Sequence, residues 1–136
     1  MENESYKRRI RSFVRREGRM TRGQQRALEE LWPKYGISPE SPVELERLFG
    51  RAAHRTLEIG FGNGEALARM AEKEPQHDFI GIEVHRPGVG HLLALLEERV
   101  IDNVRIYNAD AVEILEDCLP DDSLDRVLLF FPDPWH

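Results

Sequence analysis

In Leu57-Glu58-Ile59-Gly60-Phe61-Gly62-Asn63-Gly64, a short apolar segment leads into three closely spaced glycines. Glycine adopts positive φ angles without strain and lets a backbone approach a ligand closely. The residues that follow, 64–71, have helical spacing. A strand, a glycine-rich turn and a helix in this order predict a βα unit whose turn can bind a ligand at the helix N-terminus.

The same alternation continues along the chain. Its pattern predicts strands over 55–61, 78–84, 104–109 and 126–131, and helices over 64–71, 89–101 and 111–119. Strands that alternate with helices form parallel sheets through right-handed crossovers, with helices on both faces. The sequence therefore predicts an α/β fold whose polar residues gather at the carboxyl edge of the sheet, where ligands bind in such folds.

Two further helices are expected before this sheet. Thr21 and Gln24 form a predicted capping box for a helix over 21–33, which Pro33 should end. Ser41, followed by Pro42, is the predicted N-cap of a helix that stops at Gly50. We therefore divide the chain into an N-terminal segment, 1–50, and part of an α/β domain, 51–136.

The spacing of the glycines limits the ligand that the turn can take. Dinucleotide-binding turns follow G-x-G-x-x-G, but here Glu65 occupies the position of the third glycine and would repel a pyrophosphate. A ligand without phosphates fits better, and the acidic Glu58 favours one that carries positive charge. S-adenosylmethionine meets both conditions, with Glu58, Gly60 and Gly62 as binding residues. A turn that binds nothing is the alternative.

Polar residues also follow the next two strands. Glu83 is placed to accept hydrogen bonds from ribose hydroxyls, which either a nicotinamide dinucleotide or adenosylmethionine would supply. Asn108 and Asp110 are predicted to bind an adenine amino group, with Ala109 leaving room for the ring. Asp110 is equally well explained as the N-cap of the next helix, and both roles are compatible.

A fourth cluster, Phe131-Pro132-Asp133-Pro134-Trp135, follows the last predicted strand. Prolines restrict the backbone on both sides of Asp133 and hold its carboxylate beside an aromatic ring. Such a loop can hold a planar base by stacking and hydrogen bonding, or it can be a structural turn. This cluster directly follows an apolar strand, which would be left as a sheet edge. We therefore expect further residues or a partner to cover the strand, and little activity without them.

Charge is distributed unevenly along the chain. The net charge of the 136 residues is -6, yet residues 1–35 carry ten Lys/Arg against five Asp/Glu. Nine of these cations lie between Lys7 and Arg26, opposed only by Glu17. Such a basic segment is expected to bind the phosphates of a nucleic acid, although it can also be a solvated helix face.

Composition excludes several classes of protein. With 40% hydrophobic and 32% charged residues, the chain is neither disordered nor fibrous. Its longest apolar run, 127–131, is far shorter than the roughly 20 residues that span a bilayer. A single cysteine, Cys118, forms no internal disulfide, so the expected location is the cytoplasm. Histidine and cysteine spacing predicts no metal site.

Taken together, these motifs resemble the bacterial tRNA (guanine-N7-)-methyltransferases, a family of class I adenosylmethionine-dependent enzymes with a Rossmann-like fold. The resemblance covers the chain from the basic segment to His136. It rests on the segments 9–16, 57–62, 81–90, 110–113 and 130–136, of which Phe130-Phe131-Pro132-Asp133-Pro134-Trp135-His136 is the most specific. The family continues past this histidine, so only its N-terminal portion is matched.

The resemblance implies roles for individual residues. Asp133 matches the family's catalytic position and, with Glu58, Glu83 and Asp110, its acidic cofactor positions. The implied reaction methylates N7 of a guanine in tRNA, and the family implies a guanine in the variable loop. The residues expected to contact tRNA are Arg8, Arg9, Arg11, Arg15, Arg16, Trp135 and His136. The alternative functions are another adenosylmethionine-dependent base methyltransferase, an NAD-dependent oxidoreductase, or a non-catalytic RNA-binding module. The sequence leaves the oligomeric state open, and association of two chains through the edge strand is one expectation.

Overall fold

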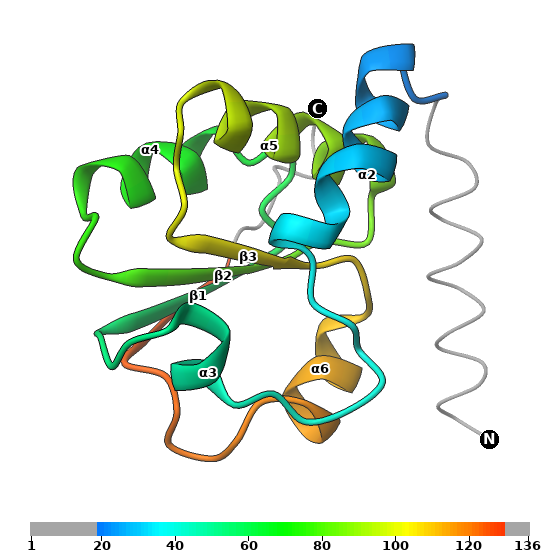
Figure 1. Ribbon diagram of the computed structural model, residues 1–136. Helices are drawn as coiled ribbons and strands as arrows, with labels where there is room; N and C mark the ends of the chain where they lie inside the picture. Colours follow the sequence, from blue (N-terminus) through cyan, green and yellow to red (C-terminus); the bar gives the residue numbers. More distant parts are fainter. Residues whose placement is uncertain (1–18, 130–136) are drawn as a thin grey trace, which may run out of the picture.

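The computed structural model describes residues 19–129, which fold around one parallel sheet (Figure 1). Its strands are β1 (Arg55–Ile59), β2 (Asp78–Ile82), β3 (Val104–Tyr107) and β4 (Arg126–Leu129), in the order β3-β2-β1-β4. All three pairings are parallel, which confirms the predicted α/β fold with its first four strands. Because the order reverses at β1, this strand and its loop occupy the centre of the carboxyl edge.

Helices cover both faces of the sheet (Figure 1). On one face lie α4 (Glu65–Lys73) and α5 (Arg86–Glu98), with α2 (Arg22–Tyr35) packed against α5. The other face carries α3 (Leu45–Phe49) and α6 (Ala111–Asp117). Each layer has its own apolar cluster: Leu67, Leu92 and Leu96 are fully buried in the first, and Leu57, Ile80 and Ile114 in the second.

The two helices before the sheet differ from the predictions in where the first one ends and where the second one begins. The capping box at Thr21 is confirmed, but α2 continues past Pro33 to Tyr35. Pro33 lies in the last turn, and the buried Tyr35 anchors that turn by donating from its hydroxyl to Glu97 at 3.2 Å. The prediction that the helix ends at Pro33 was therefore wrong.

The prediction of Ser41 as an N-cap was also wrong. Helix α3 begins at Leu45 with Glu44 as its N-cap, and Gly50 ends it in the left-handed region with φ 74°, as expected. The backbone N–H of Val43 donates to the carbonyl of Cys118 at 2.9 Å. This contact ties the segment before α3 to the end of α6, so the helix starts later than the sequence suggests.

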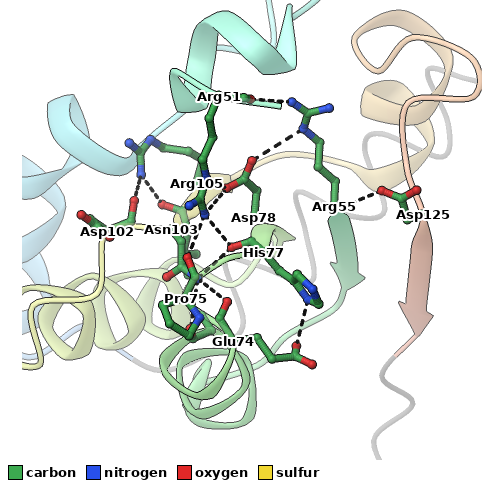
Figure 2. Close-up of polar contacts among 12 residues, drawn as sticks. Arg51, Arg55, Glu74, Pro75, His77, Asp78, Asp102, Asn103, Arg105 and Asp125 are labelled. Carbon is green, nitrogen blue, oxygen red and sulfur yellow. Dashed lines mark hydrogen bonds and ion pairs between the residues drawn. The ribbon is translucent and has the colours of Figure 1, made fainter. Parts of the chain in front are cut away.

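A polar network fastens the amino ends of the strands (Figure 2). Asp78, at the start of β2, has a buried side chain that accepts two hydrogen bonds from Arg51, at 2.7 and 2.9 Å, and lies 3.7 Å from Nε of Arg55. Arg55 also donates its backbone N–H to Asp125 at 2.8 Å, just before β4. The carboxylate is therefore compensated, as a buried charge must be. Three strands are joined at the edge opposite to the expected ligand site.

The strand β4 is an apolar edge, as predicted. Val127 and Leu129 are 52% and 57% exposed, whereas Arg126 on the opposite face donates to Thr56 at 3.0 Å and to Glu74, the C-cap of α4, at 3.3 Å. Among the described residues, β4 pairs only with β1 and is therefore the edge of the sheet. Within residues 19–129, no helix is long and apolar enough to cross a membrane.

Candidate functional site

The loop after β1 is shaped by glycines in the left-handed region. Gly60, Gly62 and Gly64 have φ angles of 74°, 66° and 80°, which other residues adopt only with strain. The N–H of Gly60 donates to Ile82 at 2.8 Å, and that of Gly64 donates to Phe61 at 3.0 Å. The first bond continues the pairing with β2 and the second closes a turn, so β1 ends at Ile59, two residues earlier than predicted. The resulting glycine loop, residues 60–64, leads directly into α4.

The carboxylate of Glu83 joins this loop to the next one. One of its oxygens accepts the backbone N–H of Gly62 at 2.7 Å, and the other accepts the N–H of His85 at 3.0 Å. His85 is the N-cap of α5, so one side chain holds both the glycine loop and the start of a helix. Each carboxylate oxygen retains a second lone-pair direction. Glu83 therefore keeps acceptor capacity for a ligand while it positions the loop.

Asn108 extends the same arrangement to the loop after β3. Its side-chain N–H groups donate to the carbonyl oxygens of Glu83 at 2.8 Å and Val84 at 3.3 Å. This bracing role was not anticipated from the sequence, which suggested only a ligand contact. Asp110 caps α6 by accepting the N–H of Val112 at 3.0 Å. The capping interpretation of Asp110 is thus confirmed, and its role toward a ligand stays a prediction.

A pocket of about 240 Å³ opens beside these loops. Its lining comes from the ends of the first three strands and from the residues that follow them, and it includes the acidic residues Glu83 and Asp110. The residues that surround it are Ile59, Gly60, Ile82, Glu83, Val84, Ala109, Asp110 and Ala111. It is smaller than the roughly 300 Å³ at which ligand sites usually begin. The pocket therefore has room for only part of a ligand of ordinary size.

Glu58 lies away from this pocket, on the face of the sheet that α4 covers. Its register partner on β2 is Gly81, where a Cβ atom would lie 2.7 Å from Leu67 of α4. Glu58 is only 8% exposed, and among the described residues its Oε2 atom has no hydrogen-bond partner. Burial raises the pKa of the Glu58 carboxyl above its ordinary value. A buried carboxylate without a partner is costly, which marks this position as one that structural stability alone does not explain.

The remaining predicted site residues lie outside the described part of the chain, 19–129. These are Arg8, Arg9, Arg11, Arg15, Arg16, Asp133, Trp135 and His136. The structure brings together Gly60, Gly62, Glu83, Asn108, Ala109 and Asp110 at the carboxyl edge. Within the described residues, no group of three or more His, Cys, Asp or Glu side chains is arranged to hold a metal ion.

Comparison with known proteins identifies the family. A family profile described as "Putative methyltransferase" matches residues 52–136. The chain belongs to this methyltransferase family. The match covers all four strands and the whole carboxyl edge, including the glycine loop and Glu83.

Relatives of this methyltransferase chain carry a more specific name. This chain is 60% identical over 129 residues to the tRNA (guanine-N(7)-)-methyltransferase of Methylococcus capsulatus, and the match covers 95% of this chain and 56% of that protein. The enzyme of the same name from Alkalilimnicola ehrlichii is 61% identical over 132 residues, with 95% and 56% covered. The resemblance drawn from the motifs is confirmed, and the chain spans about half the length of the curated relatives it matches.

Solved structures of other methyltransferases share the fold. An antibiotic-related methyltransferase aligns with a TM-score of 0.55 at 18% identity, covering 71% of this chain and 48% of that one. The phosphoethanolamine N-methyltransferase 2 of Haemonchus contortus, solved in complex with S-adenosyl-L-methionine, aligns with a TM-score of 0.53 at 24% identity, covering 88% and 28%. At these identities the likeness shows the fold alone.

The burial of Glu58 gives a prediction for stability. Because the pKa of this carboxyl is raised in the folded protein, the folded state binds more protons than the unfolded state between the ordinary value, 4.5, and the raised one. Stability therefore falls as the pH rises through this window, and the full cost applies above it. We expect Glu58→Gln to raise the denaturation midpoint of the full-length protein at about pH 8 and to have little effect at about pH 4.

Glu72→Gln, at an exposed position on α4, is the matched control and should leave the midpoint unchanged at both pH values. If Glu58→Gln lowers the midpoint at the higher pH, the Glu58 carboxylate makes a stabilising interaction in the folded protein.

Proposed function

We propose that this chain supplies the cofactor-binding half of an enzyme that transfers a methyl group from S-adenosylmethionine to N7 of a guanine in tRNA. The observation that carries the proposal is the Glu83 carboxylate, held between two loops at the rim of the pocket. The name borne by relatives that are 60% and 61% identical supports the guanine N7 specificity.

The described residues suit adenosylmethionine. Glu83 would accept hydrogen bonds from the ribose hydroxyls through its remaining lone pairs, and Asp110, Asn108 and Ala109 would surround the adenine. Glu58 offers a buried carboxylate oxygen without a partner among the described residues, and a cationic ligand would compensate its charge. When bound, the cofactor supplies an electrophilic methyl group on a sulfonium.

Guanine N7 already carries a lone pair in the plane of the ring, so its methylation requires no general base. The enzyme has to align the nitrogen, the methyl carbon and the sulfur, and such alignment is worth several kcal/mol, on the order of 7 to 11 at best. We propose that Asp133 accepts hydrogen bonds from N1–H and N2–H of the guanine and stabilises the positive charge that develops on the ring. Trp135 and His136 would contact the same substrate.

The basic residues before α2 complete the proposal. Arg8, Arg9, Arg11, Arg15 and Arg16 would bind tRNA phosphates, which fix position without reading sequence. Residues 1–50 would then serve the RNA, whereas residues 51–136 would carry the cofactor site. The division at residue 50 is part of the proposal, as is a cytoplasmic location.

The proposed reaction is tested by identifying the product. We expect the full-length protein, given adenosylmethionine and unmodified tRNA, to produce N7-methylguanosine, measured by mass spectrometry of nucleoside digests. Asp133→Ala should reduce kcat about a hundred-fold or more, because a misplaced substrate loses alignment. The appearance of N6-methyladenosine, or full kcat in Asp133→Ala, would contradict the assignment.

Glu83 is tested by comparing two substitutions. Both Glu83→Ala and Glu83→Gln should weaken adenosylmethionine binding about ten-fold or more, because buried hydrogen-bonding groups are left unpaired. The glutamine fails because its NH₂ group would face either the N–H of Gly62 or that of His85. Calorimetry on the full-length protein measures both affinities, with Glu116→Gln on the exposed side of α6 as control. Wild-type affinity in Glu83→Gln would place the cofactor elsewhere.

The basic segment is tested through salt dependence. Deleting residues 1–20 should weaken tRNA binding and flatten the plot of log affinity against log salt, since each lost phosphate contact lowers the slope by about one. Adenosylmethionine affinity should not change. The measurement is filter binding at several salt concentrations, and an unchanged slope would remove the segment from the RNA interface.

A further inference from the structure

The first two turns of α5 contain two glycines, Gly88 and Gly90, which the proposed function does not use. Both are buried. Glycine is, after proline, the least favourable residue inside a helix, so two of them within three residues call for a structural reason. The reason is close contact on two different sides of α5.

Gly88 faces the glycine loop. A Cβ atom at this position would overlap the carbonyl oxygen of Gly62 and lie 3.0 Å from its carbonyl carbon. One turn further, the Nδ1 atom of His91 lies 2.9 Å from the carbonyl oxygen of Asn63. A carbonyl oxygen can only accept, so His91 is the donor. Helix α5 therefore contacts two consecutive peptide groups of the loop.

Gly90 faces α2. A Cβ atom there would lie 2.6 Å from the carbonyl oxygen of Gln24 and 3.0 Å from its Cα atom. Gln24 belongs to the first turn of α2, where it closes the capping box with Thr21 through hydrogen bonds of 2.9 and 3.1 Å. The start of α2, which contains the last two cations of the basic segment, Arg22 and Arg26, is thus packed backbone to backbone on the same helical turns that contact the glycine loop.

We propose that Gly88, Gly90 and His91 are positioning residues that fix the distance between the cofactor loop and the start of α2. Gly88 and His91 hold the loop for adenosylmethionine, whereas Gly90 sets where α2 presents the basic segment to tRNA. Contacts between backbones cannot be relieved by a change of rotamer, so an added methyl group must move one of the two elements. The inference rests on the proposed function, because it assigns each contact to one of its two ligands.

The glycines are tested by three alanine variants of the full-length protein. Gly88→Ala should raise KM for adenosylmethionine about ten-fold, because the loop must shift, and leave KM for tRNA within about two-fold. Gly90→Ala should raise KM for tRNA about ten-fold and leave KM for adenosylmethionine within about two-fold. The matched control is Gly23→Ala in α2, where a Cβ atom would meet only Thr21 Oγ1 at 3.9 Å, and it should change neither constant. If Gly88→Ala and Gly90→Ala change the same constant equally, or change none, the proposal is wrong.

His91 provides a test that does not depend on a steric clash. His91→Leu removes the donor to Asn63 and should raise KM for adenosylmethionine about three- to ten-fold at nearly constant kcat. His91→Asn places an N–H group close to the position of Nδ1 and should restore most of the affinity. Equal KM values in wild type and His91→Leu, or equal losses in His91→Leu and His91→Asn, would overturn the role.

The proposed function and the positioning roles of Gly88, Gly90 and His91 are contradicted by different results. If the wild-type protein binds no adenosylmethionine by calorimetry, the proposed function is wrong and the positioning roles lose their ligand. If the wild type binds it and Gly88→Ala and His91→Leu bind it equally well, only the positioning roles are wrong.

Discussion

The carboxyl edge of the sheet depends on one carboxylate, that of Glu83. It accepts the backbone N–H groups of Gly62 and His85, which belong to two different loops, and Asn108 from a third loop donates to its backbone carbonyl. Hydrogen bonds from N–H groups to an ionised carboxylate are stronger than neutral ones. Without this side chain, the glycine loop and the start of α5 would lose their common support, and the pocket would lose part of its wall.

The buried carboxylates Asp78 and Glu58 differ in whether nearby cations compensate their charge. At the amino edge, Asp78 also has one buried oxygen without a hydrogen bond, Oδ2, but the guanidinium groups of Arg51 and Arg55 compensate its charge. Toward the carboxyl edge, Glu58 keeps a buried oxygen without a partner among the described residues, and its pKa is raised by burial. The first arrangement holds the fold together. The second costs stability when the carboxylate is ionised, because burial is the only cause of its raised pKa and no nearby cation among the described residues offsets it.

Helix α5 connects the parts of the molecule that the proposed function separates. Its apolar face packs on the sheet and on α2, and its first two turns contact both the glycine loop and the start of α2. At Gly88 and Gly90 the neighbouring backbone lies too close for a Cβ atom, so these two contacts leave little space between the elements. An enzyme that must bring a nucleic-acid base to a methyl donor benefits from a fixed distance.

The sequence by itself determined the α/β fold, the identity of the first four strands, the capping box at Thr21 and the acidic residues at the carboxyl edge. These follow from local periodicity and from turn chemistry, which short segments carry without outside help. Tertiary structure decided what depends on neighbours distant in sequence. The anchoring of Tyr35 by Glu97 carries α2 past Pro33, and the contact of Val43 with Cys118 delays the start of α3. Likewise, the role of Gly88 becomes visible only when Gly62, twenty-six residues earlier, is packed against it.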